Sequence, residues 1–190
     1  MTVAGPHGWS GLRPAQRSEQ SGFTLLELAI VIFIMALMFT VAIPYMGAYR
    51  KAKLKSEARR LAGRASFLFE EAAAQKVLLR LVFDLDRQAY GVLRLDPMTP
   101  APEFIPDNGT GGKPVQLPES VSIRDVTVAD LGSFTEGRIG CQFYPSGYVD
   151  ATLIHLVDLS GHVMSLAINP ATGRVIIVEG DVGLDAMLTQ

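Results

Sequence analysis

The sequence predicts an α+β fold in which one long N-terminal helix packs on an antiparallel, β-sandwich-like head. Three observations lead to this prediction. An apolar stretch begins near residue 23, an amphipathic stretch follows it, and the rest of the chain alternates short apolar runs with turns rich in glycine and proline. The first two patterns are typical of helices, and the third is typical of antiparallel strands.

The apolar stretch covers residues 23–49 and contains a single charged residue, Glu27. The 22 residues from Leu28 to Tyr49 carry no charge. With about 1.5 Å of rise per residue they form a helix of roughly 30 Å, which matches the hydrocarbon thickness of a bilayer. We therefore expect a transmembrane helix here. Pro44 removes a backbone donor and predicts a kink or a melted turn, although membrane helices also tolerate proline without either.

Glu27 is the unusual residue of this stretch. An ionised carboxylate inside an apolar membrane helix costs about 2.5 kcal/mol or more, and such residues usually mark a functional site. The side chain therefore needs a positively charged partner. The alternative is a glutamate at the membrane interface whose carboxylate reaches water.

Residues 22–27 read Gly-Phe-Thr-Leu-Leu-Glu, and the polar residues before them contain no apolar signal-peptide core. This arrangement resembles the type IV pilin-like proteins, which are the pilins and the pseudopilins of type II secretion. The resemblance implies that a prepilin peptidase removes residues 1–22 as a leader by cleaving between Gly22 and Phe23. It implies N-methylation of the new amino group of Phe23, which would pair with Glu27 of a neighbouring subunit during assembly. It also implies a single-pass inner-membrane protein with its C-terminal head in the periplasm.

A basic amphipathic stem helix is expected over residues 50–76, ending near Gln75 or Lys76. Its apolar positions recur at steps of four and three residues: Leu54, Ala58, Leu61, Ala65, Leu68 and Ala72. This spacing places them on one helical face, and the small side chains allow a sheet to approach closely. We expect this face to pack against the head of the same chain.

Charge is unevenly distributed along the chain. Residues 50–64 hold seven basic residues and one acidic residue, a net charge of +6, whereas residues 65–190 hold eight basic and sixteen acidic residues, a net charge of −8. The basic residues near the membrane would face acidic lipid headgroups or acidic neighbouring subunits. The positive-inside rule alone would keep the basic stem in the cytoplasm. We follow the leader motif instead, which places the head outside.

The remaining residues, 77–190, are expected to form the β-rich head. A hairpin is predicted from 77–85 and 89–95 around the turn 86–88, and further strands are predicted at 121–128, 137–144, 151–158, 163–169 and 175–179. The segment 96–118 is rich in proline and glycine and predicts an exposed loop. Its Gly109-Thr-Gly-Gly-Lys113 run lacks the spacing of a phosphate-binding loop, and Pro114 follows the lysine, so no nucleotide site is expected.

A stem helix that leads into a hairpin resembles the H-type minor pseudopilins and the related FimT/FimU-type minor pilins, a GspH/FimT-like group. Residues 143–147 (Phe-Tyr-Pro-Ser-Gly) and 172–175 (Thr-Gly-Arg-Val) resemble two C-terminal signatures of these proteins. The resemblance implies a minor pseudopilin at the tip of a short periplasmic pseudopilus that drives the export of folded proteins. The partners that it implies are other major and minor pseudopilins, the prepilin peptidase, the inner-membrane assembly platform and membrane lipid.

No residue pattern indicates an enzyme, a cofactor or a metal site. The single cysteine, Cys141, excludes an intramolecular disulfide and is expected to be a small buried residue. His155 and His162 are seven residues apart across a turn and could face each other, but no cysteine or carboxylate cluster completes a metal shell. Glu179 and Asp181 offer too few oxygen ligands for calcium.

Two other function classes stay open. A FimT/FimU-type minor pilin would serve pilus assembly or DNA uptake, but the acidic head and the acidic tail after Arg174 argue against nucleic-acid binding. A membrane-anchored enzyme or receptor that only mimics the leader motif would keep residues 1–22 in the mature protein.

Overall fold

The structure is a computed structural model that describes residues 23–96, 98, 102–107, 109 and 113–188, without the side chains of 41–46, 48 and 188. The chain divides into two compact units, residues 1–41 and residues 42–190. The predicted leader, residues 1–22, lies outside the described residues.

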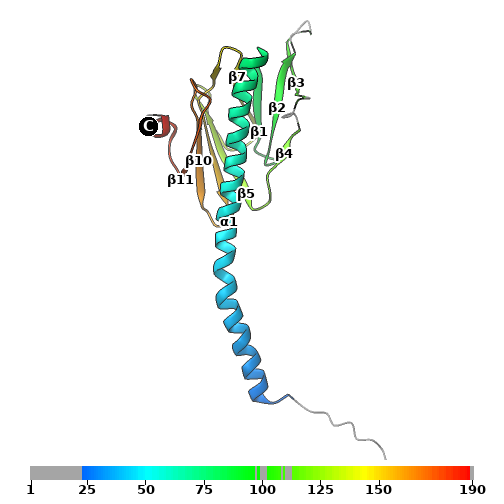
Figure 1. Cartoon of the computed structure of the whole chain (residues 1–190), viewed down its shortest axis with the longest axis vertical. Helices are drawn as coiled ribbons and strands as arrows, with labels where there is room; N and C mark the ends of the chain where they lie inside the picture. Colours follow the sequence, from blue (N-terminus) through cyan, green and yellow to red (C-terminus); the bar gives the residue numbers. More distant parts are fainter. Residues whose placement is uncertain (1–22, 97, 99–101, 108, 110–112, 189–190) are drawn as a thin grey trace, which may run out of the picture. The chain divides into compact units, whose positions relative to one another are not determined.

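One long helix, α1 (Leu25–Gln75), supplies most of the helical part of the fold (Figure 1). Its C-terminus is fixed by Lys76, which has a φ of 56°. The backbone N–H of Val77 then donates to the carbonyl oxygen of Ala72 at 3.2 Å, which satisfies one of the free carbonyls of the last turn. The predicted end of the helix near Gln75 or Lys76 is confirmed.

The head contains two antiparallel sheets. The first has the order β3-β2-β1-β7-β8, with β4 also paired to β2. Its strands are β1 (Leu79–Asp84), β2 (Ala89–Asp96), β3 (Glu103–Pro106), β4 (Val115–Gln116), β7 (Arg138–Tyr144) and β8 (Tyr148–Val149). The second has the order β11-β10-β9-β5-β6. Its strands are β5 (Val121–Val128), β6 (Gly132–Phe134), β9 (Thr152–Asp158), β10 (Val163–Ile168) and β11 (Val175–Glu179).

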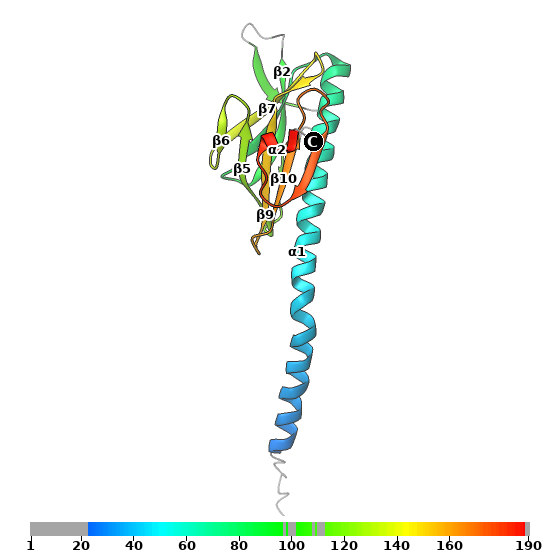
Figure 2. The ribbon, with the colours of Figure 1, turned by 90° about the vertical axis from the view of Figure 1, so that its left-hand side faces the viewer.

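The main core lies where both sheets meet the stem part of α1. All six apolar stem positions predicted from the sequence are at most 2 % exposed: Leu54, Ala58, Leu61, Ala65, Leu68 and Ala72. They belong to one cluster with side chains from both sheets, among them Phe83, Tyr90, Phe143 and Leu166. Figures 1 and 2 show this part of α1 running alongside the strands. The expected packing of the stem on its own head is confirmed.

A smaller core covers the other face of the second sheet. Leu153 of β9, Ala167 of β10 and Met187 of the short helix α2 (Leu184–Leu188) are buried together. Figure 2 shows α2 lying over β10. The C-terminal segment, residues 180–188, therefore covers a sheet face that would otherwise be open to water, and β9 is buried on both faces.

The sequence and the structure differ mainly in the short elements. The predicted hairpin and the five later strands are present within one or two residues of their expected ends. Within the segment predicted as an exposed loop, residues 96–118, the structure adds β3 and β4, which pair with β2. It also adds β6, β8 and α2. Such short elements form because a partner strand or a sheet face is available, so local patterns do not reveal them.

Candidate assembly site

Thr24 begins α1 by capping its first turn. Its hydroxyl oxygen accepts a hydrogen bond from the backbone N–H of Glu27 at 3.2 Å, and its carbonyl oxygen accepts one from the N–H of Leu28 at 3.1 Å. A threonine at the cap followed three residues later by glutamate is a typical helix start. Phe23 precedes the cap and is 81 % exposed. The sequence motif therefore also specifies where the helix starts; Gly22 lies outside the described residues.

Residues 23–40, which are the first turns of α1 and the two residues before it, are exposed at every position. Their side chains are apolar on all sides, and Glu27 is the only charged residue among them. A helix that is hydrophobic all round is normally buried in a large protein core or in a membrane. The acidic side chain lies in the first turn, where the partial positive charge of a helix N-terminus favours a carboxylate.

No helix among the described residues combines the length and the apolarity that crossing a membrane requires. Pro44 lies within α1, but its side chain is among those that the structure does not describe. The transmembrane assignment of residues 23–49 and the kink at Pro44 therefore stay predictions.

One acidic residue stands among the basic residues of the stem. Glu57 is 5 % exposed, and its carboxylate lies 3.7 Å from Lys53 and 3.8 Å from Arg60. Glu57 Oε2, Arg64 Nε and the hydroxyl of Tyr90 are buried without a hydrogen-bond partner in the described part of the chain. Burial raises the pKa of the Tyr90 hydroxyl above its ordinary value, so this phenol stays neutral. The stem thus packs on the first sheet through buried polar atoms of Glu57, Arg64 and Tyr90 as well as through the apolar core.

The sequence signature at residues 172–175 forms the turn that touches the stem. Gly173 has a φ of 64°, and a Cβ atom at this position would lie 2.1 Å from Cγ of Phe69. The carbonyl oxygen of Gly173 accepts a hydrogen bond from the Ser66 hydroxyl at 3.4 Å. Glycine is required here because a side chain would collide with the helix.

A cluster of charged groups that sequence reasoning missed holds the C-terminal segment on the second sheet. Asp125 Oδ2 lies 2.7 Å from His155 Nδ1, and Asp125 Oδ1 lies 2.6 Å from Arg124. The same guanidinium donates to Asp181 at 2.8 Å, and His155 Nε2 lies 3.3 Å from the other Asp181 oxygen. These residues come from β5, β9 and the C-terminal segment, so no local motif joins them.

The environment of the cluster shifts two pKa values. The Asp181 hydrogen bond, followed by the Asp125 hydrogen bond, raises the pKa of the Arg124 guanidinium above its ordinary value. The Arg124 hydrogen bond in turn holds the pKa of the Asp181 carboxyl below its ordinary value. Both groups are therefore charged at neutral pH.

The two histidines that could have faced each other contact different carboxylates. His155 contacts Asp125 and Asp181, whereas His162 Nδ1 lies 2.9 Å from Asp158. Among the described residues no group of three or more histidine, cysteine, aspartate or glutamate side chains is placed to hold a metal ion. The Cys141 side chain is fully buried, and burial raises the pKa of its thiol to about 12.

Comparison with known proteins gives two kinds of similarity. Residues 17–43 match the family described as the prokaryotic N-terminal methylation motif. A segment of 76 residues is 41 % identical to the type II secretion system protein H of Pseudomonas aeruginosa, and it spans 40 % of this chain and 43 % of that relative. A motif of this type suggests anchoring in the inner membrane.

Two solved structures of the minor pseudopilin EpsH from the type II secretion system of Vibrio cholerae have the same fold. One aligns with a TM-score of 0.55 and 15 % identity over 70 % of this chain and 99 % of that chain. The other aligns with a TM-score of 0.51 and 16 % identity over 67 % and 97 %. The chain therefore carries a prokaryotic N-terminal methylation motif and a pilin-like α+β fold, and it is similar in sequence to a type II secretion system protein H.

Proposed function

We propose that this chain is an H-type minor pseudopilin of a type II secretion system and has a structural, non-enzymatic role. A prepilin peptidase removes residues 1–22, and the amino group of Phe23 is then methylated. The apolar part of α1 holds the subunit in the inner membrane, with the head in the periplasm. The subunit joins the tip of a short pseudopilus, together with other pseudopilins and the assembly platform, and growth of this filament pushes folded proteins outward.

One observation carries this proposal: the residues that match the methylation motif, 17–43, include an exposed apolar helix segment that contains one carboxylate, Glu27. Apolar helices of neighbouring subunits would cover the exposed surface. The positively charged amino group at Phe23 of a neighbour would neutralise Glu27, because an unpaired carboxylate in that environment is costly. This pairing would set the axial register between subunits.

The proposal is supported by the similarity to a type II secretion system protein H and by the shared fold with minor pseudopilins. A FimT/FimU-type minor pilin is the alternative, because pilins also carry the methylation motif. Its DNA-uptake variant is disfavoured by charge: the head from residue 65 onward has a net charge of −8, whereas DNA binding requires clustered basic residues.

The test is the substitution Glu27→Ala in the full-length chain, expressed in a cell with an active secretion system. Loss of one partner of a desolvated charge pair costs about 2–5 kcal/mol, so we expect incorporation into pseudopilin complexes to fall at least tenfold and export to fall with it. Incorporation is measured by crosslinking the head to other pseudopilins.

The matched control is Glu70→Ala, which removes an exposed carboxylate from the stem. It should leave both incorporation and export unchanged. Normal crosslinking and export with Glu27→Ala would refute the proposed register mechanism. If Glu27→Ala leaves export normal but impairs pilus formation, the chain is a FimT/FimU-type minor pilin instead.

A further inference from the structure

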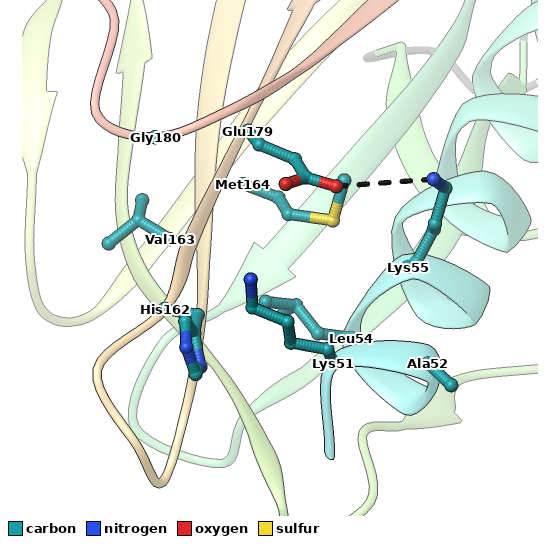
Figure 3. A pocket seen from close by; sticks show the side chains of 9 residues that line it. All are labelled: Lys51, Ala52, Leu54, Lys55, His162, Val163, Met164, Glu179 and Gly180. Atoms are coloured by element: carbon teal, nitrogen blue, oxygen red, sulfur yellow. Dashed lines mark ion pairs between the residues drawn. The ribbon is translucent and has the colours of Figure 1, made fainter. Parts of the chain in front are cut away.

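A pocket of about 470 Å³ opens between the first turns of the stem and the strands β10 and β11. Figure 3 shows its lining. Leu54 and Met164 supply an apolar floor, and the charged side chains Lys51, Lys55 and Glu179 stand around it. The pocket thus combines an apolar base with a mainly cationic rim.

The ammonium group of Lys51 is the least compensated charge of this rim. Figure 3 shows the side chain pointing into the pocket, and no ion pair joins it to any described residue. Lys55 lies 4.0 Å from Glu179, but both side chains are at least half exposed, so this pair is weak. His162 borders the pocket, and its Nδ1 is 2.9 Å from Asp158. One ammonium is therefore free for an anion, and a second is only loosely held.

The position of the pocket along the chain indicates which anion is available. The 22 uncharged residues 28–49 end immediately before four basic residues within six positions: Arg50, Lys51, Lys53 and Lys55. If residues 28–49 lie in the bilayer, as the proposed function requires, these basic residues lie at the level of the headgroups. Basic clusters that directly follow a membrane segment attract anionic lipids.

We propose that this pocket binds the headgroup of an anionic phospholipid. The lipid phosphate sits between the ammonium groups of Lys51 and Lys55, and the glycerol end of the lipid rests on Leu54 and Met164. Glu179 accepts hydrogen bonds from headgroup hydroxyls, which favours a hydroxylated headgroup such as that of phosphatidylglycerol over a simple phosphate. The bound lipid holds the part of the head around this pocket at the membrane surface. This inference rests on the proposed function, because it needs the helix to be membrane-anchored.

The experiment uses the full-length chain in detergent micelles and measures bound lipid by native mass spectrometry. Phosphatidylglycerol and phosphatidylcholine are added separately. Phosphatidylglycerol should be retained preferentially, and the double variant Lys51→Gln/Lys55→Gln should bind it about thirtyfold more weakly, since each lysine near a lipid surface contributes about fivefold. The single variant Lys51→Gln should show about a fivefold loss.

The matched control is Arg59→Gln, which removes the same charge from an exposed stem position that does not line the pocket. It should retain phosphatidylglycerol as the unsubstituted chain does. An equal loss with Arg59→Gln would show diffuse attraction rather than a site. Equal retention of both lipids, or full displacement of phosphatidylglycerol by equimolar inorganic phosphate, would also overturn the proposal.

Two further readouts separate this inference from the proposed function and from a protein partner. Flotation with vesicles tests anchoring: if the unsubstituted chain does not float, the proposed function fails, and if it floats without a lipid preference, only the pocket proposal fails. Crosslinking to other pseudopilins tests the competing occupant. If the double variant loses crosslinks but keeps phosphatidylglycerol, the pocket is a subunit contact and the lipid proposal is wrong.

Discussion

Gly173 lies in a turn of the head that packs against the stem helix. Its φ of 64° is unfavourable for other residues by about 1–2 kcal/mol, and a Cβ atom would stand 2.1 Å from Cγ of Phe69. The substitution Gly173→Ala must therefore displace the turn or the phenylalanine. Together with an overpacking cost of about 1–3 kcal/mol, we expect a loss of about 2–5 kcal/mol in the free energy of unfolding, measured by chemical denaturation.

Gly161 provides the control for this prediction. It also has a positive φ, 82°, but a Cβ atom there would meet nothing within 4 Å. Gly161→Ala should cost only the conformational part, about 1–2 kcal/mol. Equal losses for the two variants would show that contact with the stem at Gly173 contributes nothing.

At the scale of single residues, the sequence predicted whether a side chain is buried better than it predicted which side chains it contacts. Burial of Cys141 was predicted from its place in an apolar strand and is confirmed, since its exposure is 0 %. The surroundings of His155 were not predicted, because Asp125 and Asp181 approach it from 30 and 26 positions away in the sequence. Contacts of this range depend on strand register, which a single sequence does not specify.

At the scale of elements, the C-terminal segment (residues 180–188) depends on a small number of polar anchors. The Ser165 hydroxyl donates to the carbonyl oxygen of Gly180 at 2.6 Å and accepts from the N–H of Val182 at 3.0 Å. Asp181 adds the contacts to Arg124 and His155. Because Arg124 holds the pKa of Asp181 below its ordinary value of 3.8, the carboxylate stabilises the folded segment above that pH. This stabilisation is lost as the pH falls through the lower folded-state value.

The substitution Asp181→Asn should reproduce this acid effect at neutral pH. We expect backbone amides of the C-terminal segment to exchange with solvent about twofold to fivefold faster, since exposed ion pairs contribute little. Amides of β9 and β10 should keep their protection. Asp130→Asn, in the turn between β5 and β6, is the control and should change neither rate. Uniform acceleration over the whole second sheet, or no acceleration at all, would contradict the anchoring role of Asp181.

The elements themselves could be predicted wherever a periodic apolar pattern was long enough. The stem face recurs over nineteen residues from Leu54 to Ala72, and its buried positions are those that the spacing selects. β4 and β8 have two residues each and α2 has five, so they contain too little pattern to be recognised. β4 forms because it pairs with β2, β8 because it pairs with β7, and α2 because it packs on the open face of the second sheet.

At the scale of the whole molecule, the described parts have opposite surface chemistry. Residues 23–40 expose apolar side chains and one carboxylate, whereas the unit from residue 42 onward has two buried apolar cores and exposes only scattered apolar side chains, such as Leu131 and Leu159. The first surface needs lipid or other helices around it, because a continuous apolar surface is rarely left open to water. This division is what a filament subunit with a membrane-embedded anchor requires. The sequence indicated it through the uncharged run of residues 28–49 and the basic residues that begin directly after it.

The most direct test of the proposed assembly is the intact mass of the protein extracted from membranes of cells with an active prepilin peptidase. We expect a chain that begins at Phe23, lacks residues 1–22 and carries the added mass of one methyl group on its amino terminus. Co-expression with an inactive peptidase should leave the full chain. A mature protein that still contains residues 1–22, or that begins at any residue other than Phe23, would refute the proposed processing and assembly.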